Sequence, residues 1–424
     1  MIKFLFKGVI RDKSRSLFPI ITVMAGVLLC VVGYSWINGA EANMIETSAK
    51  FNTGHVKIMS RAYAEEADQI PNDLAYIGVE SLTRKLQTNF PDFLWTPRIR
   101  FGGLLDIPDE KGETRAQGPV AGLAVDLFSI RGLETETLNL EEALIRGKLP
   151  ENPGEILISE DFAVSLGVQP GDIATLISST MYGSMAVTNF TIAGTIRFGV
   201  AAMDRGAMIA DIEDIRASLD MDDAAGEILG FFKDFVYRDE IAAEETARFN
   251  AQYSEENEEF SPVMDTLRNQ TGMAELLDMM GVFASAMIFI FIIAMSIVLW
   301  NAGLMGSLRR YGEIGVRLAM GETKTHLYRT MILESLIIGF IGTVIGTSLG
   351  LTIAYYLQTH GVDFGSLMKN ASLVLSNVMR AKVTWFSHVI GFIPGFLATF
   401  LGAAISGLGI FRRETSQLIK ELEA

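Results

Sequence analysis

Long apolar runs are the most prominent feature of the sequence. Four of them, residues 16–40, 279–308, 335–362 and 383–411, contain no Asp, Glu, Lys or Arg. Each exceeds the roughly 20 residues that a helix needs to cross a bilayer. Four runs of this length do not fit the shorter core helices of a soluble protein. The pattern therefore predicts four transmembrane helices, the first separated from the other three by a long polar stretch.

A basic segment precedes the first run. Residues 1–15 contain five Lys and Arg and one acid, with apolar residues between them, which is typical of an amphipathic helix on the cytoplasmic membrane face. A cleaved signal peptide is the alternative interpretation of this end of the chain. The apolar run is long, and no small-x-small cleavage site closes it before the polar stretch. We therefore expect an uncleaved helix.

The polar stretch, residues 41–275, has the periodicities of a folded domain. Residues 154–176 are expected to form a strand, a helix, a glycine turn and a second strand. Another helix is expected at 263–280, continuing directly into the second span. The other expected strands are 54–60, 98–107, 118–127, 189–199, 207–210 and 230–237, and the other expected helices are 79–89, 212–219 and 241–253. This mixed order predicts an α+β domain.

Composition divides the chain in the same way. Of the 424 residues, 49% are hydrophobic, which is high for a soluble protein and low for one buried wholly in lipid. Residues 41–275 hold 19 Lys and Arg against 41 Asp and Glu, a net charge of −22, whereas the rest of the chain carries +7. Such an acidic domain argues against nucleic acid as a partner. The single cysteine, Cys30, lies in the first run, so the domain must be held by its own core.

A short polar segment between the second and third runs, residues 309–321, reads RRYGEIGVRLAMG. Glu313 precedes Arg317 by four positions, the favourable order for an ion pair on a helix. Two glycines inside the helical pattern each cost about 1 kcal/mol relative to alanine, which suggests that something approaches the helix closely. Gly321 is placed to end the helix. An ordinary cytoplasmic loop helix is the alternative interpretation.

This segment, with its continuation to Gly350, resembles the R-x-x-E-I-G-x-R-x-A-x-G segment of the FtsX/MacB/LolC–LolE superfamily of ABC-transporter permeases. In that superfamily the segment is the coupling helix, which sits in a groove of a separate cytoplasmic ATPase. The resemblance implies that residues 309–329 couple this chain to an ATPase dimer, which binds ATP and Mg, while the chain itself holds no cofactor. The residues expected to carry the coupling are Arg310, Tyr311, Glu313, Gly315, Arg317, Ala319 and Gly321.

The resemblance extends to other parts of the chain. The string within residues 154–176 resembles the lobe inserted into the ectodomains of MacB and LolC/LolE. It implies a two-lobed domain with residues 133–199 as the insertion. The superfamily also implies a second permease subunit, either the same chain or a paralogue, and a periplasmic carrier or adaptor. The tail, residues 412–424, resembles the superfamily's closing segment in its basic start but lacks the usual proline.

Small residues recur at four-residue spacing in the third and fourth runs. Such spacing lets helices approach closely in lipid. Pro394 is expected to kink the fourth helix. The expected helix-packing positions are Gly342, Gly346, Gly350, Gly391, Gly395 and Gly402. The same faces, or those of the first two helices, are candidate contacts between two permease subunits.

No motif in the chain indicates catalysis. The sequence has no G-x-x-x-x-G-K-[ST] phosphate loop, whereas MacB carries a fused ATPase. Residues 346–350 match G-x-S-x-G, but Ser348 lies in an apolar helical run rather than in the strand–turn–helix that a nucleophile requires. The four histidines are scattered without metal-ligand spacing. We therefore expect neither a catalytic residue nor a metal site in this chain.

The distribution of Lys and Arg predicts the topology. Five lie in residues 1–15 and five in 309–329, against three in the loop 363–382. The positive-inside rule then places both termini in the cytoplasm, and the domain on the periplasmic side of the inner membrane. No charged residue is expected in the middle of a span, which argues against an ion or proton relay.

The expected function is mechanical. A cytoplasmic ATPase would move the coupling helix, and the helices would pass this movement to the domain. Release of lipoproteins or export of another lipophilic cargo, as in LolC/LolE, is favoured because a domain of 235 residues suits capture of a substrate or docking of a carrier. The alternatives are an FtsX-like subunit that controls an extracytoplasmic enzyme, and MacB-like efflux of drugs or peptides.

Overall fold

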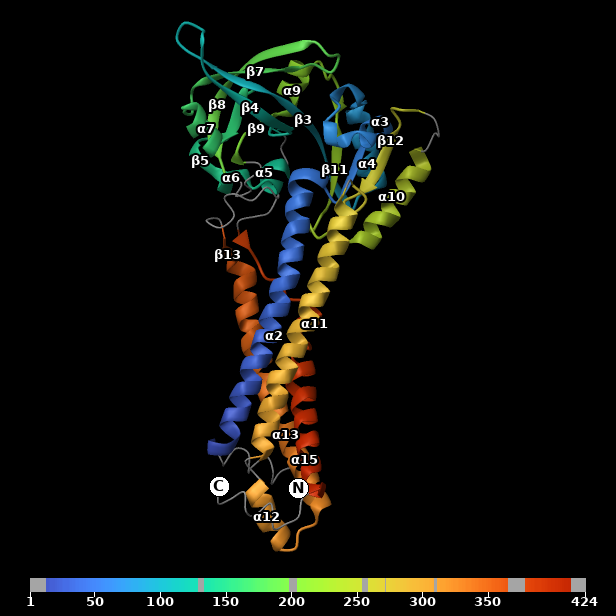
Figure 1. The fold of residues 1–424 in the computed structure, drawn as a ribbon. Helices are drawn as coiled ribbons and strands as arrows, with labels where there is room; N and C mark the ends of the chain where they lie inside the picture. The colour runs from blue at the N-terminus through green and yellow to red at the C-terminus, as the bar shows by residue number, and fades with distance from the viewer. Residues whose placement is uncertain are drawn as a thin grey trace. The chain divides into compact units, whose positions relative to one another are not determined.

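The computed structural model describes residues 13–128, 133–197, 204–253, 258–270, 272–308, 311–364 and 378–412. Residues 1–12 of the expected amphipathic helix, Arg310 and residues 413–424 of the tail lie outside the described residues. The chain divides into two compact units (Figure 1). Residues 1–42, 279–362 and 379–424 form one, called here the membrane unit. Residues 43–278 and 363–378 form the other, called here the β-rich domain.

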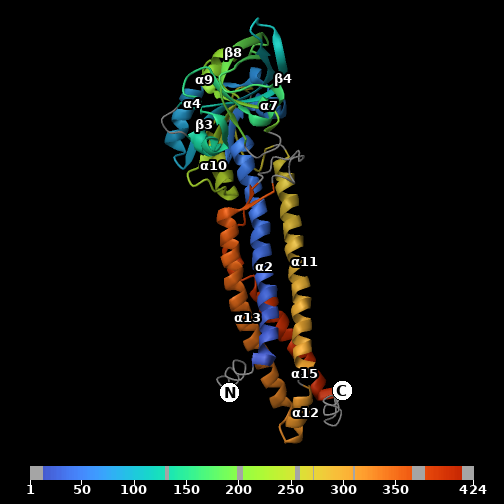
Figure 2. The same cartoon turned by 90° about the vertical axis from the view of Figure 1, so that its left-hand side faces the viewer.

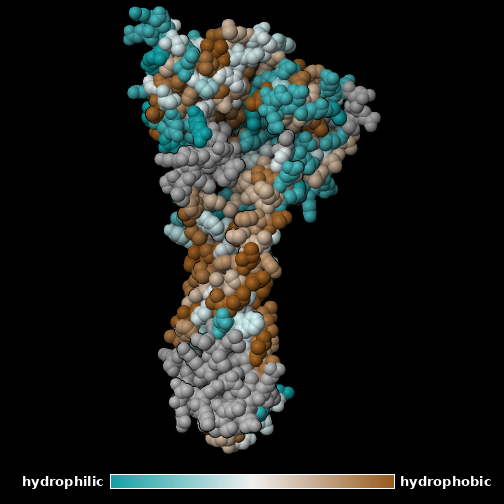
Figure 3. Space-filling model, in the orientation of Figure 1, coloured by the Kyte–Doolittle hydropathy of each residue, from teal (hydrophilic) through white to brown (hydrophobic). Residues whose placement is uncertain are grey.

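Four helical segments are long and apolar enough to cross a membrane, as the sequence predicts. Three of them are α2 (Lys13–Ser48), α11 (Met273–Leu308) and α13 (Lys324–His360), which run alongside one another in Figure 2. Apolar side chains cover most of the coloured surface of these helices in Figure 3, whereas the β-rich domain is largely polar outside. The chain is therefore an integral membrane protein with one large domain between its first and second spans.

The fourth span is irregular. It consists of the 3-10 turn η4 (Trp385–His388), the π-helix η5 (Ile393–Ala398) and the α-helix α15 (Thr399–Arg412). Pro394 lies in the first turn of the π-helix. Proline has no N–H, and its ring clashes with the preceding turn, so the regular helical pattern is interrupted where the sequence places the proline. Two short strands, β13 (Val362–Asp363) and β14 (Val378–Met379), pair before this span.

The β-rich domain is built on a ten-stranded sheet of order β12-β1-β11-β3-β4-β9-β6-β8-β5, in which β7 joins β3 to β8. A separate pair of strands, β2 (Tyr76–Ile77) and β10 (Ala224–Ala225), lies outside this sheet. The ten strands are β1 (Val56–Ser60), β3 (Phe93–Pro108), β4 (Thr114–Val125), β5 (Leu144–Gly147), β6 (Glu155–Ser159), β7 (Ile173–Ser179), β8 (Met185–Ile196), β9 (Ala207–Asp211), β11 (Glu227–Phe232) and β12 (Pro262–Thr266).

The long strand β3 belongs to two lobes. Its first part, up to Arg98, pairs with β11, and its second part, from Ile99 onward, pairs with β4. Because β7 pairs with both β3 and β8, the strands β3-β4-β9-β6-β8-β7 close into a barrel. The other lobe contains β12, β1 and β11. The residues expected as an insertion, 133–199, supply β5 to β8, of which β6, β7 and β8 belong to the barrel. Strands β3, β4 and β9 complete it.

Helices cover both lobes. In the first lobe α10 (Asp239–Tyr253) packs on β12, and α4 (Val79–Asn89) packs on β3. In the barrel, α7 (Glu160–Leu166) packs on β6, and α9 (Ile212–Leu219) packs on β9. One cluster of buried apolar side chains includes residues from both lobes, from Ile58 of β1 to Phe190 of β8. The remaining short helices are α3 (Arg61–Glu65), α5 (Leu133–Thr137) and α6 (Leu140–Ala143).

Most expected elements of this domain are confirmed, but the expected helix over 263–280 is wrong in its first part. Pro262–Thr266 form the strand β12, which pairs with β1, and the helix α11 begins only at Met273. Met264 and Thr266 alternate into the interior, and the edge of β1 supplies hydrogen-bond partners that a helix would leave unused. The expected strand 230–237 ends at Phe232, because Asp234 accepts the N–H of Val236 in a turn.

Gly122 and Gly102 provide a matched test of the barrel packing. A methyl group at Gly122 would stand 2.0 Å from Cζ of Phe101, whereas one at Gly102 would meet no atom within 4 Å. We expect Gly122→Ala to lower the thermal unfolding midpoint of the purified protein by several degrees, because overpacking a core costs about 1–3 kcal/mol. Gly102→Ala should leave the midpoint unchanged. Equal midpoints for the two variants would contradict this packing.

Candidate functional site

The polar segment between the second and third spans forms the helix α12 (Tyr311–Ala319). The helix ends as expected at Gly321, whose φ of +97° is rarely adopted by residues with a side chain. The N–H of Gly321 donates to the carbonyl of Leu318 and the N–H of Glu322 donates to that of Arg317, each at 3.1 Å. This pair of bonds is a Schellman motif, which satisfies carbonyls that the end of a helix leaves open.

The expected coupling residues have different surroundings. Arg310 lies outside the described residues, and the side chains of Tyr311 and Glu313 are likewise not described. The ion pair between Glu313 and Arg317 therefore stays a prediction. Two of the other positions, Arg317 and Ala319, are exposed, whereas Gly315 is buried.

One apolar contact joins α12 to the helix that follows it. Leu318 packs against a cluster formed by the buried side chains of Leu327 and Met331 on α13. Only a short turn separates the two helices, since α13 begins at Lys324. A movement of α12 would therefore be passed to α13 through both the chain and this contact.

Three glycines of α13 lie directly against α2. A methyl group at any of them would stand 2.6 to 2.9 Å from an atom of α2, which leaves no room for a side chain. Small residues at such spacing let two helix backbones approach closely in lipid. The contacting pairs are Gly342 with Val23, Gly346 with Met24, and Gly350 with Val31.

The glycines of the fourth span lie against threonines of α13. Methyl groups at Gly391 and Gly395 would stand 3.1 and 2.3 Å from the hydroxyls of Thr347 and Thr343, respectively. Gly402 approaches α11 instead, because its methyl group would stand 2.9 Å from the carbonyl of Trp300. The small-residue faces of the third and fourth spans are thus used in contacts within this chain.

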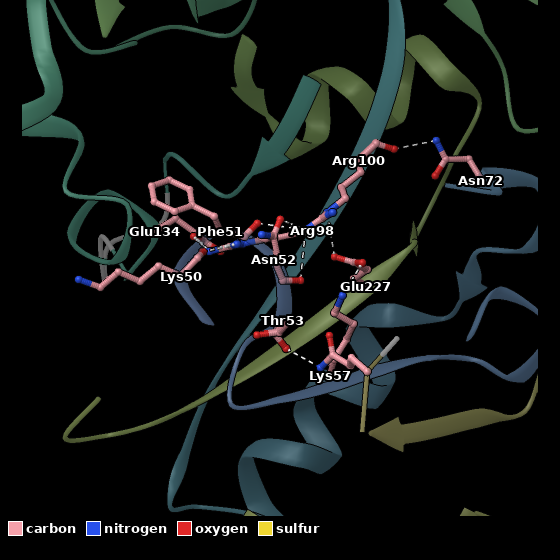
Figure 4. Close-up of polar contacts among 11 residues, drawn as sticks. Lys50, Phe51, Asn52, Thr53, Lys57, Asn72, Arg98, Arg100, Glu134 and Glu227 are labelled. Atoms are coloured by element: carbon pink, nitrogen blue, oxygen red, sulfur yellow. Dashed lines mark hydrogen bonds and ion pairs between the residues drawn. The ribbon is translucent and has the colours of Figure 1, made fainter. Parts of the chain in front are cut away.

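A second site, which is not among those expected from the sequence, lies at the end of α2. The helix α2 continues as the π-helix η1 (Ala49–Thr53), whose Ala49 carbonyl accepts the N–H of Gly54 at 2.9 Å. Side chains from distant segments bind the next four carbonyls (Figure 4). Arg98 donates to Lys50 at 2.7 Å, Arg100 donates to Phe51 at 3.0 Å and to Asn52 at 3.2 Å, and Gln270 donates to Thr53 at 3.0 Å. We call this arrangement the carbonyl clamp.

The guanidinium of Arg98 is held from its other side. It forms a bidentate ion pair with Glu134 of α5, with N–O distances of 2.8 and 2.7 Å. Both side chains are only 1% exposed, and the hydroxyl of Thr96 also donates to Glu134. A bidentate pair of this kind fixes the plane of the guanidinium as well as its position.

Arg100 is paired with a second buried carboxylate. Its Nε lies 3.3 Å from Glu227, which also accepts from Lys57 of β1 at 2.7 Å (Figure 4). Burial alone raises the pKa of Glu227, but Lys57 and Arg100 outweigh it and hold that pKa below its ordinary value. The carboxylate is therefore ionised. The carbonyl end of a helix carries partial negative charge, which favours the cations of the clamp at this position.

The two arginines of this site could have been recognised from the sequence, although their partners could not. Arg98 and Arg100 stand two positions apart in an expected strand, so both side chains lie on the same face of it. Two arginines on one face of a strand with apolar neighbours indicate buried partners. Those partners, Glu134, Glu227 and the carbonyls of η1, lie up to 127 residues away in the sequence, and no periodicity relates them.

His55 lies next to the clamp. Its Nδ1 accepts the N–H of Phe232 at 2.9 Å, and its ring packs beside those of Phe231 and Tyr237. Burial lowers the pKa of His55 to about 4, against an opposing effect of Asp234. The imidazole is therefore neutral at neutral pH.

The G-x-S-x-G motif of residues 346–350 is part of a helix. Ser348 lies inside α13, and its hydroxyl donates to the carbonyl of Val344 at 2.8 Å. This is an ordinary bond to the preceding turn rather than the arrangement of a nucleophile. Within the described ranges of the chain, no group of three His, Cys, Asp or Glu is placed to hold a metal ion.

Comparison with known proteins identifies the membrane unit. Residues 285–415, which include α12 and α13, match the profile of the FtsX-like permease C-terminal family. The chain is 25% identical over 233 residues to the lipoprotein-releasing system transmembrane protein LolC of Xylella fastidiosa, a match that covers 53% of this chain and 54% of that protein. It is 28% identical over 152 residues to the macrolide export ATP-binding/permease protein MacB of Mannheimia succiniciproducens, covering 36% and 22% respectively.

The four spans and the family match define the chain as an ABC-transporter permease. Through this unit it is similar to the permeases of the FtsX/MacB/LolC–LolE superfamily. The alignment with LolC spans about half the length of that relative. The crystal structure of the periplasmic region of MacB from Actinobacillus actinomycetemcomitans is also similar, at 12% identity and a TM-score of 0.34, covering 52% of this chain and 95% of that one.

The buried His55 should make the β-rich domain sensitive to acid. The pKa of His55 is about 4 in the folded domain, against 6.5 for a free side chain, so the unfolded chain takes up the proton first as the pH falls. Stability is then complete above pH 6.5 and declines by about 3 kcal/mol by pH 4. In His55→Asn, where Oδ1 replaces Nδ1 as the acceptor, the unfolding midpoint should fall less steeply between these pH values. Equal slopes for the two proteins would contradict a buried neutral His55.

Proposed function

We propose that this chain is the permease subunit of a transporter in which a separate ATPase dimer drives movements of the β-rich domain. The observation that carries the proposal is the position of α12. This helix lies inside the family match, between two spans, and presents an exposed Arg317 while Leu318 joins it to α13. These features support a role for α12 as the coupling helix. In this proposal ATP and Mg are bound by the partner ATPase, and both termini and α12 lie in the cytoplasm.

Movement would pass from α12 to the domain through helix contacts. α12 would move α13, which lies against α2 along its glycine face. α2 is one continuous helix as far as Ser48, and its last residues already belong to the β-rich domain. Because packed helices move as rigid bodies, displacement of α13 would displace α2 and therefore the segment that enters the domain.

A second permease subunit would complete the membrane path. Four spans are few to enclose a large cargo, and the glycine faces of the third and fourth spans are occupied within the subunit. By contrast, α11 buries no described residue of its most apolar stretch. Its exposed side chains include Phe283, Phe289 and Ile293. We propose that two subunits meet through their first two spans, either as two copies of this chain or as this chain and a paralogue.

We propose a lipophilic cargo, with lipoprotein first. The alignment with the relative named for lipoprotein release covers 53% of this chain, and the β-rich domain is large enough to capture a substrate or to dock a periplasmic carrier. The described spans contain no buried acid or base, which favours work at the outer face of the membrane over an ion-lined pore. Efflux of drugs or peptides is a second candidate, since one relative is named for macrolide export.

Depletion of the chain in its host tests the cargo. Lipoproteins should accumulate in the inner membrane within one or two generations, as measured by fractionation, while cell-wall cleavage at division continues. Normal lipoprotein sorting together with failed division would contradict transport and support an FtsX-like signalling role. Normal sorting with increased sensitivity to macrolides would instead support efflux.

Charge reversal at Glu313 tests the coupling helix. Glu313→Lys should abolish cargo release while the membrane level of the protein stays unchanged, because the change removes both the predicted ion pair with Arg317 and the proposed contact with the ATPase. The matched control is Glu322→Lys, an equal reversal at an exposed residue just beyond the end of α12. Local ion pairs on a helix contribute only about 0.2–0.5 kcal/mol, so loss of folding is not expected. Activity that survives in Glu313→Lys would refute the assigned role.

A further inference from the structure

We propose that the carbonyl clamp is the positioning element through which α2 moves both lobes of the β-rich domain. Arg98, Arg100 and Gln270 donate the hydrogen bonds of the clamp. In this proposal they do not touch cargo and affect it only through movement of the lobes. The proposal rests on the proposed function, because it assigns the point at which movement of a span enters the domain. The proposal has two requirements. The end of α2 must be held firmly, and the residues that hold it must lie on an element shared by both lobes.

The carbonyl clamp binds every carbonyl that the end of this helix leaves without a partner, which is unusual. The last four carbonyls of a helix have no partners within it and are commonly left to water or to a single capping residue. Here the carbonyls of Lys50, Phe51, Asn52 and Thr53 are all bound by side chains 48 to 217 residues away in the sequence. Arg100 also donates to the side-chain oxygen of Asn52 at 2.9 Å. The bonds from the arginines are charge-assisted, and Nη2 of Arg100 shares its two hydrogens among three oxygens. Movement of η1 along its axis would lengthen these bonds.

The donors themselves cannot follow by a simple change of rotamer. Arg98 is anchored by the bidentate pair with Glu134, and the partly exposed Arg100 forms a looser ion pair with Glu227, at 3.3 Å. Glu227 in turn binds Lys57, which lies on the strand that follows η1 in the chain. Displacement of η1 is therefore transmitted to the backbone of β3 instead of being absorbed by side-chain motion.

The two arginines of the clamp lie where β3 passes from one lobe to the other. Arg98 is the last residue of β3 that pairs with β11, opposite Glu227, and Arg100 pairs with Leu123 of β4 in the barrel. A force applied at these two residues acts on both lobes at once. A clamp placed farther along β3 would act on one lobe only.

Gln270 connects the clamp to the second span. It stands three residues before α11, which begins at Met273. Beside it, Ala49 of η1 shares a buried apolar cluster with Leu267 and with Leu277 of α11. The end of α2 and the start of α11 are therefore held together, so that the two helices deliver their movement to the domain as one unit.

The test compares coupling with folding in the full complex. The chain, reconstituted with its ATPase in proteoliposomes, is assayed for ATP hydrolysis and for release of a fluorescent triacylated lipoprotein. Arg100→Gln and Gln270→Met each remove donors to η1 while leaving the fully buried Arg98–Glu134 pair intact. We expect the cargo released per ATP to fall about fivefold or more, the lower end of coupling between distant sites. The ATPase rate should stay within about twofold of wild type, as expected for a step outside the ATPase. Arg84→Gln, at an exposed arginine of α4, is the matched control and should change nothing.

Hydrogen exchange supplies a readout that does not depend on cargo. ATP should change the exchange of β3 amides in the wild-type complex, and this change should be lost in Arg100→Gln. An unchanged ratio of cargo to ATP in both variants would overturn the clamp, as would a loss of release matched by an equal loss of folded protein. If the wild type releases no lipoprotein, the proposed function fails. Exchange still decides the clamp in that case, because an ATP-dependent change that is absent in the wild type or persists in Arg100→Gln refutes it.

Discussion

The carbonyls at the end of α2 impose the constraint on which the domain depends. A helix that leaves a membrane ends in carbonyls that need partners. In this chain the partners are arginines on the central strand of the adjoining domain rather than water. Burying those arginines requires acids beside them, and Glu134 and Glu227 meet that need. The helix α5 supplies Glu134 and the start of β11 supplies Glu227, so both elements lie beside the arginines of β3.

Buried ion pairs of this kind are weak arguments for stability. Removing two charges from water costs several kcal/mol for each ion, and the attraction between them often does little more than offset that cost. Their value here is geometric. An apolar cluster around Ala49 and Leu229 would hold η1 in place but would allow it to slide, whereas bonds from planar guanidinium groups fix both its distance and its register.

The membrane unit solves a different problem with different residues. Between helices in lipid there is no hydrophobic driving force, so close van der Waals contact must replace it. Gly342, Gly346 and Gly350 bring α13 against α2, and the threonines of α13 lie over the glycines of the fourth span. Contacts without large side chains present a smooth surface. Helices in such close contact move together, as the proposed transfer of movement from α12 to α2 requires.

Local physics determined much of this protein from the sequence alone. The spans follow from run length, since a bilayer sets the number of apolar residues, and Gly321 ends α12 because few other residues accept its φ. Alternation identified most strands, yet it could not show that Pro262–Thr266 would pair with β1, because the edge that captures them is formed by residues 200 positions away. The carbonyl clamp is the strongest case. The arginines are visible in the sequence, but their acids and carbonyls are brought to them only by the closed sheet, since long-range strand pairing leaves no periodic trace in a single chain.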